Sequence, residues 1–470
     1  MHIRSTAVSP SRLRALAPFR TRGAAARLAH LRPYLPVIAL GMLFVATRIA
    51  LLLFTVNERE FILPSVTNDV REIYTSWFDV LRHGEFPADD VRWQYPPAAA
   101  LVMLAPGLLP FTYATSFYLL SFVADVAVFV LLVRAARRPG PTGESGRPWA
   151  AWVWTLGVAL GGPIAYGRYD LIVTGFAVGG LVLLAGRGSH DDDALLERGV
   201  DRGGARRRHI GGALLAVGAL LKVWPALLLL GIGAARRWRD AWAGAVVAGL
   251  ALAVGFVALM PGALSFLSAQ GSRGVEVESI GALPFHVAAH HGWGGRVGLS
   301  YGSMEYLGPY VTLVARVCLV LSVLAMAWLI LWRATAKVWR ASTTADAAFV
   351  AVLLFVVTSR VISPQYMVWL VGLAAVCALH FGPDGDSVMR LPAVLVLIAT
   401  ALSCVEYPYY FEELLAAERD AVLLVTVRNL LLIAAALIGA SRLWRTTRRS
   451  GVEPVRAAEE ERRLADAVEA

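Results

Sequence analysis

Apolar segments recur along the chain from about residue 34 to about residue 443, and only short polar segments separate them. A helix needs about 20 apolar residues to cross the hydrocarbon core of a bilayer. Several segments are shorter, so the pattern predicts a mixture of full spans and short or broken helices. Counting each segment as one crossing gives about twelve spans, at 35–56, 112–134, 149–162, 170–186, 210–221, 223–235, 241–260, 310–333, 346–358, 364–381, 391–404 and 420–443.

The composition and the charge agree with one integral membrane domain. Hydrophobic residues make up 57% of the chain and 42 glycines add to that share, whereas soluble domains hold roughly 45–50% apolar residues with glycine included. The formal net charge of +10 would favour nucleic-acid binding only on the basic face of a soluble domain. Here the basic residues lie between apolar segments. We therefore predict an all-α polytopic membrane protein that contacts membrane lipids and no nucleic acid.

The distribution of basic residues predicts the orientation. Most Lys and Arg fall on the same side as the basic tail, residues 1–33, and the positive-inside rule makes that side cytoplasmic. The C-terminal tail, residues 444–470, falls on that side too. The membrane domain, residues 34–443, then exposes its two main loops, 57–96 and 261–309, at the outer face of the plasma membrane. Its first apolar segment is too long for a signal peptide, so we expect an uncleaved first span.

Residues 97–111 do not fit this topology as a full span, because a thirteenth crossing would move the later basic loops to the outer side. They predict a half-helix that enters from the outer face and returns. Irregular backbone is tolerated at membrane depth only where it packs against protein or lines a wet cavity. Pro96 and Pro97 make the start of this half-helix rigid. A broken element beside charged residues points to a binding site.

The first outer loop begins with the pattern of a surface helix. From Asp69 to Arg82, apolar and aromatic residues recur every three or four positions with polar residues between them. This spacing predicts an amphipathic helix that lies on the membrane surface. Asn68 or Asp69 can cap its first turn, and capping is therefore the structural interpretation of Asp69.

The end of the same loop concentrates charge and aromatic rings in front of the double proline. Asp89 and Asp90 fit a solvated turn. Arg92 fits an interfacial anchor, and Tyr95 fits an aromatic belt. Each interpretation accounts for one residue, but their concentration before a half-helix also favours a substrate site.

Three more positions place charge on the outer side. Arg168 and Asp170 share a tight turn in GGPIAYGRYDLIV, where an ion pair between them is the simplest account. Lys222 lies within a long apolar segment, and an ammonium at that depth costs about 2.5–3.5 kcal/mol. It must face a cavity or an anion, unless it snorkels to the interface. Arg360 lies at the outer end of a span.

The second outer loop carries a further group of titratable residues. The adjacent histidines in this group point apart in any regular element, so no metal site is predicted. The chain's three cysteines lie in apolar segments without metal spacing and fit buried thiols. The titratable residues of this loop are Arg273, Glu276, Glu278, His286, His290 and His291.

Carboxylates and cations thus meet at the outer membrane surface beneath an aromatic loop. This combination suits an anionic lipid-linked substrate, because the cations can hold a phosphate and a carboxylate can act as base on a hydroxyl. No glycine loop of the cytosolic nucleotide-binding type is present in the sequence, which argues against a nucleotide donor. The alternative is a lipid or solute transporter or flippase, whose broken helices would form a site at the midplane.

Several motifs resemble those of glycosyltransferase family 87 in the GT-C superfamily. The first outer loop is similar to the family's first extracytoplasmic loop, with Asp69, Tyr74, Gly84, Asp90 and the WQYPP that enters a helix. GRYDLIV, GGALLAVGALLKVWPALLLL and a basic RRW resemble its middle section. RGVEVESI and SRVISPQYMVWL resemble its later loop and span. The resemblance covers about residues 40 to 440.

The resemblance implies an integral membrane enzyme that moves mannose, or in some relatives arabinofuranose, from a polyprenyl phosphate to a lipid or glycan acceptor at the outer face. In such enzymes an early aspartate of the first outer loop is the base of an inverting reaction, and Asp69 matches it. The spacing to Tyr74 is one residue longer than in many relatives, which keeps Asp89 and Asp90 as alternatives. No cofactor is implied beside the lipid-linked donor. The expected substrate-binding residues are Tyr74, Asp90, Arg92, Tyr95, Arg168, Asp170, Lys222, Glu278, His286 and Arg360.

Overall fold

The computed structural model describes residues 35–57, 66–137, 148–185, 203–233, 235–266, 273–382 and 386–448. The chain forms two compact units, Met1–Ala46 and Thr47–Ala470. In the first unit, the described residues belong to helix α2 (Leu35–Val56). The predicted N-terminal tail, residues 1–33, lies outside the described residues, as do residues 449–470 of the predicted C-terminal tail.

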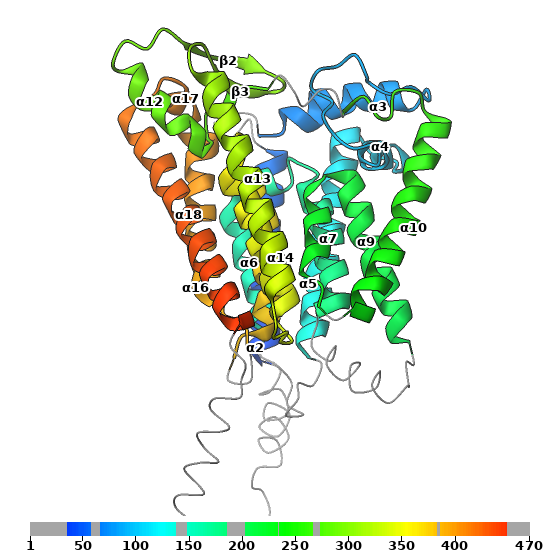
Figure 1. The fold of residues 1–470 in the computed structure, drawn as a ribbon. Helices are drawn as coiled ribbons and strands as arrows, with labels where there is room; N and C mark the ends of the chain where they lie inside the picture. Colours follow the sequence, from blue (N-terminus) through cyan, green and yellow to red (C-terminus); the bar gives the residue numbers. More distant parts are fainter. Residues whose placement is uncertain are drawn as a thin grey trace, which may run out of the picture. The chain divides into compact units, whose positions relative to one another are not determined.

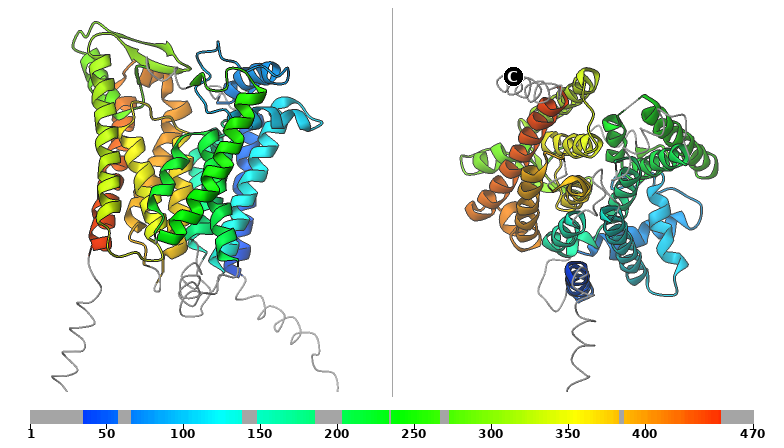
Figure 2. Two further views of the ribbon diagram at one scale, coloured as in Figure 1. Left: turned by 45° about the vertical axis from the view of Figure 1, so that its right-hand side comes forward. Right: turned by 90° about the horizontal axis from the view of Figure 1, so that it is seen from below.

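The second unit is a bundle of helices whose smaller elements gather at one end, the upper end in Figure 1. Seen along the bundle in Figure 2, α14 and α15 lie in the centre, with α16 and α18 on one side and α9 and α10 on the other. The helices of the bundle are α5 (Tyr113–Ala136), α6 (Trp149–Gly161), α7 (Asp170–Ala185), α9 (Gly204–Leu221), α10 (Ala235–Leu259), α13 (Val311–Thr335), α14 (Thr343–Thr358), α15 (Tyr366–Cys377), α16 (Arg390–Cys404) and α18 (Arg419–Arg448).

The helices have the lengths and the surfaces of a polytopic membrane protein. Among the described residues, six helices are long and apolar enough to cross a membrane, and the other apolar helices have 10–17 residues. Large apolar side chains point outward, as Val247 and Val254 of α10 do at 70% and 64% exposure. Such exposed apolar faces suit a lipid environment. The predicted helical membrane fold is confirmed, while the number of about twelve spans stays a prediction.

Helix α15 is buried on all sides because its sequence, YMVWLVGLAAVC, is apolar on all sides. Its close approach to α7 depends on Gly372. A Cβ atom at this glycine would lie 2.3 Å from Thr174 Cγ2, a distance that requires the Thr174 side chain or one of the helices to move. The contact brings the first turns of α7 and α15 together, and these turns carry Asp170 and Trp369.

The first loop forms the helix that its periodicity predicts. A π-helical turn, η3 (Asp69–Tyr74), continues into α3 (Thr75–Leu81), and the buried residues are on the predicted apolar face. The predicted half-helix appears as α4 (Ala99–Leu104) and η4 (Ala105–Leu108). Ala98 to Ala100 are fully buried, and the amide of Ala98 donates to the carbonyl of Leu220 over 3.0 Å. The start of this element is thus packed against the rest of the bundle.

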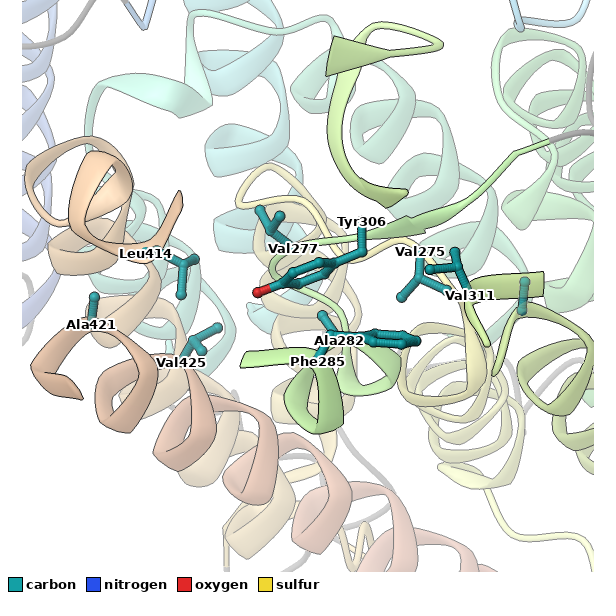
Figure 3. Close-up of a cluster of buried hydrophobic side chains, with 10 residues drawn as sticks. Val275, Val277, Ala282, Phe285, Tyr306, Val311, Leu414, Ala421 and Val425 are labelled. Atoms are coloured by element: carbon teal, nitrogen blue, oxygen red, sulfur yellow. The ribbon is translucent and has the colours of Figure 1, made fainter. Parts of the chain in front are cut away.

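The second loop contains a small antiparallel sheet that the sequence did not predict. Its strands are β1 (Val275–Glu276), β2 (Arg296–Ser300) and β3 (Ser303–Leu307), in the order β1-β3-β2. Figure 3 shows the cluster beneath it, where Val277 and Tyr306 lie near Phe285 of α12 (Leu283–Ala289) and Val425 of α18. Leu414 of α17 (Phe411–Leu415) belongs to the same cluster. This apolar contact fixes the sheet on the bundle.

Candidate active site

Two ion pairs from three segments of the chain form the centre of the site. Asp69 Oδ2 lies 3.0 Å from Arg168 Nε, and Asp170 Oδ1 lies 2.6 Å from Lys222 Nζ. Asp69 begins η3, Arg168 is in the turn before α7, Asp170 begins α7, and Lys222 follows α9. The direct Arg168–Asp170 pair that the sequence suggested is replaced, because each residue takes a partner from another segment.

Arg168 holds the start of the first-loop helix. Besides Asp69, its Nη1 donates to the carbonyls of Val66 (3.0 Å) and Gly167 (2.8 Å). Gly167 permits this approach, since a Cβ atom there would lie 2.6 Å from the Val66 oxygen. Asp69 is the first helical residue and its carboxylate faces Arg168, so the structure does not use it as a helix cap. The Asp69 side chain is 28% exposed, and a hydroxyl can reach it.

Lys222 lies in a cage of aromatic rings. Its Nζ is 5.0–5.7 Å from the ring centres of Tyr95, Tyr169, Tyr366 and Trp369. An ammonium has three N–H donors, and one of them bonds Asp170. Aromatic faces stabilise a cation but are weak hydrogen-bond acceptors. The remaining donors can therefore serve an anion, and 14% of the Lys222 side chain is exposed.

The hydroxyl of Tyr74 is a buried donor that lacks a partner. Tyr74 is 1% exposed, and within the described part of the chain its hydroxyl makes no hydrogen bond. Burial, followed by the nearby Tyr95 and Asp69, raises the pKa of Tyr74 well above its ordinary value. The hydroxyl is thus protonated and close to Asp69. An unmade hydrogen bond of this kind costs about 1–3 kcal/mol, which a ligand oxygen would recover.

Asp90 is saturated with bonds from its own loop. Its Oδ2 accepts from Arg92 Nη2 (2.7 Å) and from Trp77 Nε1 (2.9 Å). Partial burial opposes ionisation, but the hydrogen bonds from Arg92 and Trp77 prevail and lower the pKa of Asp90. A carboxylate with a lowered pKa is a weaker base. Asp89 is an exposed residue of the same turn, so neither alternative matches the placement of Asp69.

Arg360 was expected to contact the substrate, but in the structure it lies beside the sheet of the second loop. Its Nη1 donates over 3.0 Å to the carbonyl of Arg273, and the Arg273 side chain bonds Glu305 (2.9 Å) and Gln94 (3.0 Å). Gln94 in turn donates to the carbonyl of Tyr301. These bonds tie the first loop to the sheet. The local sequence around Arg360 gave no sign of them.

Glu278 and His286 belong to the packing below the sheet. Glu278 Oε1 lies 3.4 Å from Arg428 Nη1, and burial raises the pKa of Glu278. His286 is fully buried, with Nε2 2.8 Å from the Val277 carbonyl and Nδ1 2.8 Å from the Tyr306 hydroxyl. Both ring nitrogens are thereby used. The prediction that His286 binds substrate has no support in this arrangement.

Two site residues escaped the sequence analysis although their segment was singled out. Tyr366 and Trp369 occur in SPQYMVW, three positions apart at the start of α15. Aromatic residues at this spacing share a helix face. That face is turned toward Lys222.

Among the described residues, no group of three or more His, Cys, Asp or Glu is arranged to hold a metal ion.

A model of glycosyltransferase family 87 matches residues 93–364, which is more than half of the chain. The match includes Arg168, Asp170 and Lys222, while Asp69 precedes it. The chain is also similar to the crystal structure of ArnT from Cupriavidus metallidurans bound to undecaprenyl phosphate, with 16% identity, a TM-score of 0.39, and coverage of 86% of this chain and 77% of that one. No curated protein matches the sequence.

Proposed function

The chain belongs to glycosyltransferase family 87, and from this membership we propose that it transfers a sugar from a polyprenyl-phosphate donor to a hydroxyl of a lipid or glycan acceptor. Mannose is the proposed sugar and arabinofuranose the competing one. The proposed setting is the outer face of the plasma membrane, with both termini in the cytoplasm and with no cofactor beside the donor. The observation that carries the proposal is the Asp69–Arg168 pair beside the caged ammonium of Lys222.

Asp69 is the proposed base. The acceptor oxygen forms a bond to the anomeric carbon while its proton passes to the Asp69 carboxylate. The bond between the anomeric carbon and the phosphate oxygen breaks, and its electron pair leaves with the polyprenyl phosphate. Attack from the face opposite the phosphate inverts the configuration. Arg168 orients the carboxylate, a role that replaces the phosphate contact expected from the sequence.

Lys222 is the proposed partner of the leaving phosphate. Negative charge grows on that phosphate as the bond breaks, so an ammonium with unused donors stabilises the transition state more than the ground state. Loss of one such donor typically costs about 10²–10³ in rate. The Tyr74 hydroxyl, which is buried and unpaired among the described residues, is the proposed donor to an oxygen of the sugar phosphate.

The exposed apolar helix faces support a donor that enters from lipid. Each CH₂ of a prenyl chain buried from water adds about 0.8 kcal/mol to membrane anchoring. The chain therefore holds the donor in the bilayer, beside these apolar faces. Recognition of the sugar then falls to the polar groups around Asp69 and Lys222.

The deciding experiment supplies the purified protein with polyprenyl-phosphate mannose or polyprenyl-phosphate arabinofuranose and a native lipid extract. Mass spectrometry identifies any glycosylated product. We expect a new glycosidic product with one donor and release of polyprenyl phosphate in equal amount. Movement of the donor across a proteoliposome bilayer without a new glycosidic bond would instead favour the transporter.

A further inference from the structure

Asp170 receives two donors on a single oxygen. Lys222 Nζ and the indole Nε1 of Trp369 each lie 2.6 Å from Asp170 Oδ1. The three residues come from α7, the residues after α9, and α15. They are distant in sequence, because 199 positions separate Asp170 from Trp369. The carboxylate therefore joins the cation to the most deeply buried helix of the bundle.

The Trp369 ring is stacked against two other aromatic rings. Tyr366 stacks on it with ring centres 3.8 Å apart, and Trp224 of η6 (Trp224–Gly231) stacks on it at 5.3 Å, with an angle of 21° between planes in both cases. Trp369 is 1% exposed. An indole packed in this way has no freedom to rotate. Its N–H direction, and with it the position of Asp170 Oδ1, is set by the packing of α15.

We propose that Trp369 is a positioning residue for the transfer reaction, which fixes the Asp170 carboxylate and thereby the Lys222 ammonium in its aromatic cage. The inference rests on the proposed function, since it gives the held ammonium its task at the leaving phosphate. Trp369 itself acts through Asp170 and not on the substrate.

The physical reason lies in the flexibility of the lysine. Lys222 carries its charge on a four-carbon stem with several rotatable bonds, and the surrounding rings attract a cation without fixing its direction. Asp170 supplies the direction, but only while its own oxygen is held. Without the indole N–H, one hydrogen bond remains to set the pair, and the ammonium gains a range of positions. A less well oriented ammonium stabilises the transition state less, so the rate of transfer falls.

The alternative is that Trp369 only fills space in the stack, and Trp224 provides the matched control. Trp224 is equally buried and covers one face of Trp369, but its Nε1 has no hydrogen-bond partner among the described residues. Trp369→Phe and Trp224→Phe therefore remove comparable ring area from one stack. Only the first removes a hydrogen bond to a charged group.

The first readout is steady-state transfer with the donor that the wild-type protein uses. We expect Trp369→Phe to lower kcat by about tenfold or more, because hydrogen bonds to charged groups carry that much free energy, with a smaller change in the KM for donor. Trp224→Phe should keep kcat within about threefold of wild type, as an ordinary packing change does. Equal losses in both variants would overturn the proposal.

The second readout does not depend on turnover. Lys222 and Lys337 are the only lysines in the chain, and Lys337 is exposed. Acylation of each amine by a water-soluble reagent can be followed by mass spectrometry in the intact detergent-solubilised protein, with Lys337 as the internal reference. We expect Trp369→Phe to raise the relative rate at Lys222 severalfold, and Trp224→Phe to leave it unchanged.

These readouts separate the two failures. If the wild-type protein transfers no sugar from any polyprenyl-phosphate donor, the proposed function is wrong, while the acylation ratio still shows whether Trp369 holds Lys222. If transfer occurs and the Lys222 rate is the same in both variants and in the wild type, the positioning role is wrong.

Discussion

A buried charge pair lies between helices of the bundle, and its removal gives a sharp test of the packing. Asp125 of α5 is fully buried and accepts four hydrogen bonds. Arg48 of α2 donates from Nε (2.8 Å) and Nη2 (3.2 Å), Trp154 of α6 donates from Nε1 (2.7 Å), and Tyr166 donates from its hydroxyl (2.7 Å). The perturbation is Asp125→Asn, which keeps the size of the side chain and removes its charge.

The expected cost follows from these four bonds. The amide nitrogen of asparagine would replace one carboxylate oxygen and face N–H donors of Arg48. Arg48 is 1% exposed, so its guanidinium would also lose its buried counter-charge. Breaking one partner out of a buried pair typically destabilises by about 3–5 kcal/mol. Replacing both partners by apolar residues, as in Arg48→Met with Asp125→Leu, should cost less than the sum of the two single changes.

The assay is equilibrium unfolding in mixed detergent, followed by circular dichroism. It compares the wild type, Asp125→Asn, Arg48→Met, Asp125→Leu and the double variant Arg48→Met with Asp125→Leu. We expect Asp125→Asn to lower the unfolding free energy by several kcal/mol and the double variant to recover part of it. Tyr166 lies two positions before Arg168, so transfer activity should fall as well. A loss below about 1 kcal/mol for Asp125→Asn, the range of an ordinary surface pair, would refute this account of the buried network.

Three further predictions concern the site, its pH dependence and the helix packing. Tyr74→Phe should not lower the unfolding free energy, because the Tyr74 hydroxyl has no hydrogen-bond partner among the described residues. It should weaken donor binding about tenfold, which corresponds to the loss of one hydrogen bond to a charged phosphate. Unchanged donor affinity in a binding titration would contradict this. Burial raises the pKa of Glu276 to about 7, above its value in the unfolded chain, so the folded state binds a proton more tightly than the unfolded state. Proton binding by Glu276 therefore stabilises the fold fully below the unfolded pKa, and this stabilisation is lost as pH rises through about 7. The unfolding free energy of Glu276→Gln should therefore fall less between pH 5 and pH 8 than that of the wild type, and parallel pH curves would argue against the shift. Gly372→Ala should destabilise the protein by about 1–3 kcal/mol through overpacking, since its Cβ would lie 2.3 Å from Thr174 Cγ2. Gly255→Ala on α10 is the control and should not destabilise, because a Cβ there meets nothing within 4 Å. Equal thermal shifts in the two variants would contradict the close approach of α15 to α7.

The helices and the first-loop elements could be predicted from the sequence because each depends on local patterns. The three- and four-residue spacing over Asp69–Arg82 gave the surface helix, and Pro96–Pro97 gave the start of the next one. The turn in GRYDLIV was expected from its position between two short apolar segments. The family resemblance was confirmed by a match over residues 93–364.

The pairing of the site residues could not be predicted, because it depends on contacts between distant segments. Local spacing suggested Arg168 with Asp170, whereas packing of the first loop and α9 gave them Asp69 and Lys222. Arg360 looked free for a phosphate until the fold placed the Arg273 carbonyl beside it. The sheet of the second loop was missed for a different reason. Its strands have at most five residues, which is too few to show a clear periodicity.

The most direct test of the central claim compares Asp69→Asn with Asp79→Asn in one transfer assay with polyprenyl-phosphate mannose and polyprenyl-phosphate arabinofuranose. Both aspartates belong to the first-loop helix and each has an arginine partner, but Asp79 is 57% exposed beside Arg82. A general base typically contributes about 10²–10⁴ in rate. Asp69→Asn should therefore lose most transfer while it remains folded and inserted, and Asp79→Asn should transfer as the wild type does. Near-normal turnover by Asp69→Asn would contradict the account.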